Sequence, residues 1–327
     1  MYSSSTQLNH WTFESPAEMQ ELRVKAHERF CDRYTSVIAS ASNADMDEVE
    51  ETENDVSRDL LNVEEEQQLC KLVMATGLRF AKDFQPPMWP SVVWTAFTYF
   101  RRFYLHHSAM EYMCKNVMMA CFYLACKVDE FNVTIDEFVR NLRTGDPDSN
   151  TEIILNLEPV IMAKLHYQLT VHAPYRPLEG HLIDLKTRCP DFGDVELLRP
   201  AADSQFFERA LQSDAPFLYS PTQLALAAIY HAASHLKPSP KSLRPYLELL
   251  CAEKPELLEK LEHRLVEIVH MVNSVQQMTP EVAKRLQLRA QQSMKAKAVL
   301  ERKLAAMSEK RIGNEDGNGG DGSTDDD

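Results

Sequence analysis

The sequence predicts an all-α protein built from two tandem five-helix units, with one further helix on either side. Glycine is scarce, because the 327 residues contain only nine and five of these fall in the last fifteen positions. Tight β-hairpins and phosphate-binding loops depend on glycine for positive φ angles or close backbone approach. Apolar residues instead recur at spacings of three and four, the period of a helix with one buried face. Nucleotide-binding α/β folds and all-β sandwiches are therefore not expected.

The first predicted helix begins at Ser15-Pro16, where a hydroxyl cap is followed by proline at the first helical position. An acidic linker follows it. The next helix stops at Gln85-Pro86-Pro87, because a residue before proline avoids the α region. The helix after Tyr112 is apolar on nearly all sides, as expected of a helix enclosed by others. The first unit is predicted to contain helices at about residues 63–84, 91–107, 112–128, 134–142 and 152–169.

A second series of five helices has similar relative lengths, and a basic final helix follows it. The third helix of each series is rich in small apolar residues, at Val117–Cys126 and again at Leu224–Ala233. Small side chains let neighbouring helices approach a central axis, so we interpret the two series as an internal repeat. The second series is predicted at residues 174–186, 195–212, 221–236, 242–250 and 255–278, and the final helix at 280–311.

The repeat divides the chain into five regions. They are an N-terminal helix with the acidic linker (1–60), the first unit (61–172), the second unit (173–279), a C-terminal helix (280–312) and an acidic tail predicted to be disordered (313–327).

The net charge of −14 is concentrated in two segments. Residues 44–66 hold eleven acidic side chains and one arginine, and the last fifteen residues add six acids without a base. Such runs repel and hydrate well, so we expect both to be solvated spacers. The remaining body carries a net charge of +2. This near-neutral balance argues against direct binding of nucleic acid through a basic surface.

The cysteines and the hydropathy predict a reduced, intracellular, soluble protein. Seven cysteines form no CxxC pair, and several lie in apolar helical stretches where a free thiol acts as a small hydrophobic side chain. No secretory signal pattern occurs at the N-terminus. The longest unbroken apolar run, Val117–Cys126, has ten residues, which is about half of what crosses a bilayer. We therefore expect no membrane segment.

Three short motifs have ordinary structural explanations. Asp191-Phe192-Gly193 matches the metal-binding triplet of protein kinases, but no glycine-rich loop, strand lysine or catalytic-loop motif accompanies it. His231 and His235 are spaced to share a helix face, yet without a third ligand we expect packed or solvated histidines. The Ser-Pro and Thr-Pro steps at 15, 220, 239 and 279 suit helix caps, with phosphorylation as the alternative. We predict no catalytic residue, cofactor or metal site.

Lys127 and Glu158 are harder to explain as ordinary surface charges. Lys127 ends the most apolar helix of the chain, and Glu158 lies early in the fifth helix beside core-forming residues. An unpaired ion next to a core is costly. If the two helices pack side by side, the ions can pair and present their remaining donors and acceptors to a partner. Two separately solvated charges are the alternative.

The doubled five-helix pattern and the run Tyr123–Asn132 (YLACKVDEFN) together resemble the cyclins. Three further runs are similar to one branch of that family, the cyclin of the kinase that activates other cyclin-dependent kinases. They are His10–Phe13 (HWTF), Tyr99–Leu105 (YFRRFYL) and Val171–Lys186 (VHAPYRPLEGHLIDLK). The resemblance covers about residues 8–300. It implies two cyclin boxes and a regulatory subunit rather than an enzyme.

The resemblance also implies a partner-binding site. In cyclins, a lysine of the third helix and a glutamate of the fifth helix in the first box hold the backbone of the kinase αC helix. The matching positions here are Lys127 and Glu158, with Val128 and Met162 as apolar neighbours that would pack against the same helix. In the second box the corresponding position falls at His235, so we expect that box to lack this contact.

Several partners are implied in the same way. The catalytic partner is a cyclin-dependent kinase that phosphorylates the activation loops of other such kinases and, within transcription factor IIH (TFIIH), the C-terminal domain of RNA polymerase II. A RING-finger assembly factor and the TFIIH core complete the set, and the implied location is the nucleus. The alternatives are another transcriptional cyclin, or a cyclin-fold nucleic-acid-binding factor of the general transcription factor IIB type. The latter needs a basic surface and usually a zinc ribbon.

The resemblance implies that the two terminal helices pack together outside the boxes. The sequence departs from the family pattern in three respects. Trp94 stands where the family usually has a small residue, so the local packing must rearrange around an indole. The acidic linker is longer and more charged than expected. The hydrophobic MRAIL motif with which cell-cycle cyclins dock substrates is missing from the first box, so we expect no docking of that kind.

Overall fold

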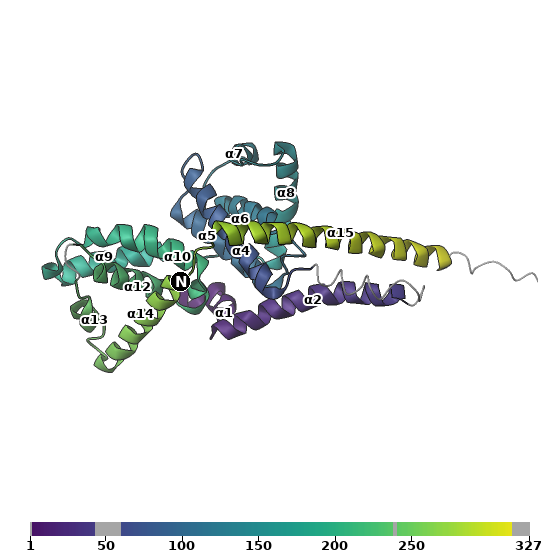
Figure 1. The fold of residues 1–327 in the computed structure, drawn as a ribbon. Helices are drawn as coiled ribbons and strands as arrows, with labels where there is room; N and C mark the ends of the chain where they lie inside the picture. Colours follow the sequence, from purple (N-terminus) through teal and green to yellow (C-terminus); the bar gives the residue numbers. More distant parts are fainter. Residues whose placement is uncertain (1, 43–59, 238–240, 316–327) are drawn as a thin grey trace, which may run out of the picture.

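The computed structural model describes residues 2–42, 60–237 and 241–315, and every regular element in these ranges is a helix (Figure 1). The fold class is therefore all-α, as the sequence predicts. Most of the acidic linker and the end of the acidic tail lie outside the described residues. The predicted disorder of the linker and of residues 316–327 concerns residues for which no structure is given, whereas residues 313–315, predicted as part of the disordered tail, continue the last helix.

The first unit is organised around one central helix, α6 (Cys114–Val128). It contacts α4, α5 and α8, and α7 packs against α8. All ten residues of the run Val117–Cys126 are buried, which confirms the prediction of an enclosed helix. The surrounding helices are α4 (Val63–Asp83), α5 (Pro90–His106), α7 (Ile135–Arg140) and α8 (Pro147–Lys164).

The second unit repeats this plan around α12 (Pro221–Ser234), but one predicted helix is interrupted. The segment predicted as a single helix at 195–212 is a 3₁₀ turn, a π-helical stretch and a short α-helix in succession. Pro200 lies between the first two and cannot donate a backbone N–H, which explains the break. The remaining elements are α9 (Tyr175–Arg188), η2 (Pro190–Phe192), η3 (Val195–Leu198), η4 (Ala201–Phe207), α10 (Glu208–Gln212), α11 (Ala215–Leu218), α13 (Arg244–Leu250), η5 (Pro255–Leu257) and α14 (Leu258–Asn273).

Side-chain caps explain where many helices begin. The predicted caps Ser15, Ser220 and Thr279 each accept a hydrogen bond from a backbone N–H three residues later. In α4, α7 and α12 the side chain of the third helical residue also accepts a hydrogen bond from the backbone N–H of the cap residue. A second backbone N–H at the start of the helix is thereby satisfied. These capping boxes are Asn62–Glu65, Thr134–Glu137 and Ser220–Gln223.

The two terminal helices, α2 (Pro16–Ser42) and α15 (Pro280–Glu315), lie side by side and extend away from the two units (Figure 1). A small apolar cluster joins them to each other and to the first unit, which confirms that they pack together. Its buried members are Phe30, Tyr34, Leu61, Met110 and Leu300. The basic side of α15 also meets the acidic start of α4, where Arg289 lies 3.2 Å from Glu65.

A short N-terminal helix, α1 (Thr6–Trp11), is not predicted by the sequence. Six residues are too few to show a helical period, and tertiary contacts hold this helix in place. The indole N–H of Trp11 donates to the side chain of Gln168 at 2.7 Å. The N–H of Phe13 donates to the carbonyl of Phe217 at 2.8 Å. The N-terminal segment is thereby fixed to the connection between the units and to the second unit.

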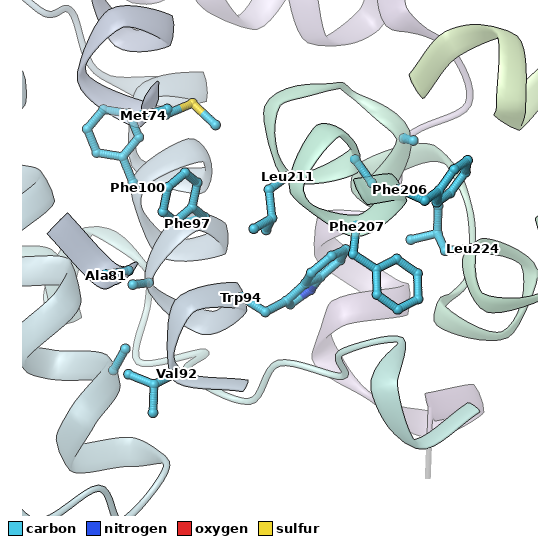
Figure 2. Close-up of a cluster of buried hydrophobic side chains, with 14 of the residues drawn as sticks. Met74, Ala81, Val92, Trp94, Phe97, Phe100, Phe206, Phe207, Leu211 and Leu224 are labelled. Carbon is cyan, nitrogen blue, oxygen red and sulfur yellow. The ribbon is translucent and has the colours of Figure 1, made fainter. Parts of the chain in front are cut away.

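Trp94 of α5 forms the apolar junction between the two units. Its side chain is only 2% exposed, and its ring makes edge contacts with Tyr175 and Phe207, each with centroids 5.9 Å apart. Figure 2 shows the indole reaching from α5 toward Phe207 and Leu224 of the second unit. The indole of Trp94 is therefore accommodated as a bridge between the units.

A buried carboxylate ties α2 to the first unit. Glu66 of α4 accepts hydrogen bonds from the hydroxyl of Ser108 at 2.8 Å and from the N–H of Ala109 at 2.6 Å. The imidazole of His27 on α2 lies 2.7 Å from the same carboxylate and 3.4 Å from the sulfur of Cys31. Hydrogen bonds to Cys31 and to Glu66 raise the pKa of His27 to about 10.

We expect the substitution Trp94→Ala to weaken the cohesion of the two units. Loss of a buried indole leaves a cavity and lowers the free energy of unfolding by about 3–5 kcal/mol. Because the indole bridges the units, the thermal transition should also broaden or split in differential scanning calorimetry. Trp89→Ala is the matched control, since Trp89 is 50% exposed. A loss no larger than that of the control would contradict the bridging role.

The high pKa of His27 predicts a pH dependence of stability. The protonated imidazole stabilises the folded state fully below about pH 6.5, and this contribution is lost as the pH rises toward about 10. His27→Gln should therefore lower the free energy of unfolding at pH 6 by on the order of 2 kcal/mol, less than for a fully buried pair, and by progressively less at pH 8 and above. Urea titrations across this range measure the difference. His10→Gln, at an exposed histidine, is the control, and a pH-independent difference for His27→Gln would refute the assignment.

Candidate functional site

Lys127 lies in the last turn of α6, where the exposed carbonyl groups of a helix C-terminus favour a cation. The chain then turns away sharply. Glu130 adopts a φ of 57°, and the N–H of Phe131 donates to the carbonyl of Cys126 at 2.8 Å. The left-handed residue Glu130, at a position where glycine is usual, ends α6. Lys127 therefore lies at the surface, directly after the buried part of the helix.

Glu158 lies on α8, and the packing of α8 against α6 brings its carboxylate to Lys127. The ammonium nitrogen Nζ of Lys127 is 2.8 Å from both Oε1 and Oε2 of Glu158. The two residues are 31 positions apart in the sequence. The pairing that the sequence predicts for side-by-side helices is therefore confirmed.

The two members of the pair differ in their exposure to solvent. The side chain of Glu158 is 12% exposed, whereas that of Lys127 is 46% exposed. The ammonium also lies 4.5 Å from the ring centroid of Tyr123, one helical turn earlier on α6. Burial raises the pKa of Tyr123, so the ring is neutral at physiological pH and presents its π face to the cation. Glu158 and Tyr123 together hold a half-exposed ammonium in one position.

Apolar side chains surround the pair. Val128 is 38% exposed, whereas Met162 is partly buried and packs against the core. Leu155, which the sequence analysis does not select, is 44% exposed. It precedes Glu158 by three residues and Met162 by seven, so the three share one stripe of α8. This spacing is the signal from which Leu155 can be found.

A proline adds a polar feature to the same stripe. Pro159 lies inside α8 and cannot donate to the carbonyl of Leu155 four residues earlier. That carbonyl therefore lacks its usual helical donor. The surface thus combines exposed apolar side chains, an ammonium with a third N–H, a carboxylate with remaining lone pairs and an extra backbone acceptor. Such a set suits the capture of backbone groups at the end of a partner helix.

Comparison with known proteins identifies the family. The model of the cyclin N-terminal domain matches residues 83–170, and the model of the cyclin C-terminal domain matches residues 173–280. Cyclin-H of Xenopus laevis is 40% identical over 236 residues, which cover 72% of this chain and 69% of that protein. The chain is a cyclin. Cyclin mcs2 of Schizosaccharomyces pombe is 30% identical over 233 residues, covering 70% of this cyclin and 69% of the relative.

Two solved structures share the fold of this cyclin. A chain in the structure of the CAK complex from Chaetomium thermophilum bound to ATP-γ-S superposes with a TM-score of 0.69 at 21% identity, covering 100% of this chain and 97% of that one. A chain of the yeast TFIIK (Kin28/Ccl1/Tfb3) complex gives a TM-score of 0.60 at 22% identity, covering 83% and 100%. At these identities the likeness concerns the fold. It shows that the chains superpose over both helical units.

The remaining motifs have structural roles in this cyclin. Phe192 is buried in a 3₁₀ turn, and Gly193 supplies a φ of 87° that other residues rarely adopt. His231 is buried beside Arg209, and burial lowers its pKa to about 4. His235 follows the last residue of α12, whereas Lys127 precedes the last residue of α6, so the two do not occupy equivalent places. Within the described ranges there is no cluster of three or more potential metal ligands.

The cysteines and the lengths of the apolar helices can be described directly from the structure. All seven cysteines are free thiols, and the sulfur atoms of Cys70 and Cys114 lie 3.6 Å apart. No helix in the described part of the chain combines the length and the apolar character needed to cross a bilayer.

The unequal exposure of the pair predicts unequal effects on the stability of the isolated cyclin. Lys127→Ala leaves a mostly buried carboxylate unpaired and should lower the free energy of unfolding by about 1–2 kcal/mol. Glu158→Ala leaves a half-exposed ammonium, which water can solvate, and should lower it by less than about 1 kcal/mol. Chemical denaturation measures both values. A larger loss for Glu158→Ala would contradict the description of Glu158 as the buried anchor.

Proposed function

We propose that this cyclin is the regulatory subunit of a CDK-activating kinase, and that Lys127, Glu158, Val128 and Met162 hold the αC helix of its catalytic partner. The observation that carries the proposal is the Lys127–Glu158 pair, fixed at 2.8 Å yet half-exposed among apolar side chains. The relation to cyclin-H and the fold shared with a chain of a CAK complex support it. Cyclins are regulatory subunits, so the chemistry belongs to the partner.

The contact is expected to use the polar groups that the pair leaves available. The third N–H of Lys127 donates to a carbonyl at the end of the kinase helix, and the remaining lone pairs of Glu158 accept from a backbone N–H. Val128 and the exposed Leu155 cover the apolar side of that helix. When the kinase covers this surface it removes water from the pair, so breaking one ion then costs on the order of 3–5 kcal/mol. Charges at the rim contribute little.

Activation follows from the position of the captured helix. A kinase transfers phosphate efficiently only when its strand lysine pairs with the αC glutamate and the ATP phosphates are held. A subunit that binds only this arrangement shifts the population toward it, by as much as its affinities for the two arrangements differ. The cyclin therefore activates without touching the substrate.

The proposal extends to the assembly in which the kinase acts. The partner kinase would phosphorylate the activation loops of other cyclin-dependent kinases and, with the TFIIH core, the C-terminal domain of RNA polymerase II in the nucleus. The yeast TFIIK complex contains three named proteins, and we infer a third, RING-finger subunit here as well. The near-neutral body of this cyclin supports assembly through proteins without direct contact to nucleic acid.

The proposed interface predicts a loss of kinase activation when either ion is removed. Lys127→Ala and Glu158→Ala should each weaken binding to the kinase by at least about 100-fold, the equivalent of about 3 kcal/mol. Binding is measured by calorimetry with the purified kinase, and activation by phosphate transfer to a CDK activation loop and to a polymerase C-terminal-domain peptide. Circular dichroism verifies that the helices persist.

Two further comparisons make this experiment specific. Lys115→Ala and Glu152→Ala remove exposed charges from the same helices, α6 and α8, and should leave binding and activity unchanged. The charge-swapped double variant Lys127→Glu with Glu158→Lys keeps an internal ion pair but reverses its polarity toward the partner, so it should stay inactive. Full activity of the double alanine variant would refute the assigned interface.

A further inference from the structure

Cys31 of α2 lies beside a histidine that a buried carboxylate holds in place. Its sulfur is 3.4 Å from Nε2 of His27, four residues earlier on the same helix. Nδ1 of His27 is 2.7 Å from Oε1 of Glu66 on α4. Thiol, imidazole and carboxylate thus follow one another across two helices. A nucleophile next to a base that a third group orients is the arrangement found where cysteine side chains are activated.

The carboxylate end of this arrangement is fixed by the loop after α5. Oε1 of Glu66 also accepts from the hydroxyl of Ser108 at 2.8 Å, and Oε2 accepts from the N–H of Ala109 at 2.6 Å. The side chain of Glu66 is only 10% exposed. Glu66 is therefore held in one position, and its bond to Nδ1 orients the ring of His27 so that Nε2 faces the sulfur.

The imidazole of His27 is a cation at neutral pH. Each ring nitrogen has an acceptor, and the hydrogen bonds to Cys31 and to Glu66 raise the pKa of His27 to about 10. A cation beside a thiol favours the thiolate, which is the form of cysteine that acts as a nucleophile. The position of His27 therefore favours the reactive form of Cys31.

A small reagent can reach this sulfur. Cys31 is partly exposed, and the side chain of His27 beside it is 18% exposed. The cysteines of α6 provide a contrast, because Cys121 and Cys126 are at most 1% exposed. Burial raises the pKa of the Cys126 thiol to about 12, so this group stays protonated inside the core. Cys31 combines access with a neighbouring cation, whereas the cysteines of α6 have no access.

We propose that Cys31 is a modification site that forms a mixed disulfide with a low-molecular-weight disulfide of the glutathione type. The thiolate of Cys31 attacks one sulfur of that disulfide, so that a new S–S bond to Cys31 forms and the original S–S bond breaks. The other half leaves as a thiolate and takes a proton from water. Cys31 is oxidised and the leaving half is reduced, so no further oxidant is needed. His27 keeps its ion pair with Glu66 throughout.

The modification acts on the contact between the terminal helices and the first box. Cys31 packs against the apolar cluster that joins α2 to α15 and to the first box. A tripeptide attached to this sulfur adds bulk and charge beside that cluster. The packing of α2 therefore loosens when Cys31 is modified and is restored when the mixed disulfide is reduced.

Reaction of the full-length cyclin with glutathione disulfide tests the site. Peptide mass spectrometry follows each cysteine separately, so Cys251 serves as the internal comparison. It is also partly exposed but follows the last residue of α13, where the helix C-terminus disfavours a thiolate. At about pH 6.5, Cys31 should form the mixed disulfide about tenfold faster than Cys251, and dithiothreitol should reverse the reaction. Equal rates at the two cysteines would overturn the proposal, and this comparison needs no variant.

The variant His27→Gln separates activation by the imidazole from simple access to the sulfur. Glutamine keeps a hydrogen-bonding side chain but removes the cation, so the reaction at Cys31 should slow by about tenfold while that at Cys251 stays unchanged. Buried Cys121 reports folding, because it reacts only in a variant that has unfolded. His10→Gln, at an exposed histidine, should react like the wild type. An unchanged rate at Cys31 in folded His27→Gln would refute the activation.

Two further measurements test the chemistry and its consequence. Iodoacetamide, which also reacts with thiolates, should modify Cys31 before Cys251. Reaction of Cys31 with iodoacetamide but not with glutathione disulfide would contradict the assigned class of reagent. Hydrogen exchange of α2 should speed up in the modified cyclin and return to its initial rate after reduction. Unchanged exchange in the fully modified protein would refute the effect on the terminal helices.

Discussion

The enclosure of α6 is the constraint from which the rest of the first box follows. Three helices pack against α6, and the fourth, α7, is placed by α8. A helix surrounded on three sides must be apolar along its whole buried length, so Val117–Cys126 carries no charge. Lys127 is the first position at which the enclosure ends, and there the helix dipole favours a cation. The packing that defines the fold therefore also fixes the location of Lys127, the charge that we propose to contact the kinase.

The division of exposure between Lys127 and Glu158 suits the role in recognition that we propose for the pair. Glu158 is held by its neighbours and stays in place without a partner, whereas Lys127 retains access to solvent on one side. A fully buried pair would have no groups left for recognition, and a fully exposed pair would be mobile and screened. An anchored carboxylate that positions a half-exposed ammonium avoids both limits. The ring of Tyr123 adds a second restraint without consuming a donor.

Sequence patterns predict the features that depend on local spacing. The long helices, their caps and the enclosed third helix of each box follow from periodicity and from residues such as Ser15 and Ser220. The pairing of Lys127 with Glu158 follows from two charges beside apolar helices. Features that join distant segments have no such pattern: the carboxylate of Glu66 collects groups from α2 and from the loop after α5. The short α1 is likewise held by tertiary contacts, and the role of Trp94 requires knowledge of how the boxes face each other.

The second box repeats the packing of the first without an ion pair like Lys127–Glu158. Its central helix α12 is enclosed in the same way, but it ends in Ala233 and Ser234 and carries no lysine where α6 has one. Its charged contribution lies elsewhere. Asp214 accepts from Arg23 of α2 at 2.9 Å and from Arg101 of α5 at 2.6 Å, so one carboxylate of the second box fixes two elements outside it. The ion pairs of Asp214 and the aromatic contacts of Trp94 together hold the second box against the first. Duplication of a stable helical unit thus allows one copy to keep a charge-bearing surface while the other supplies rigidity.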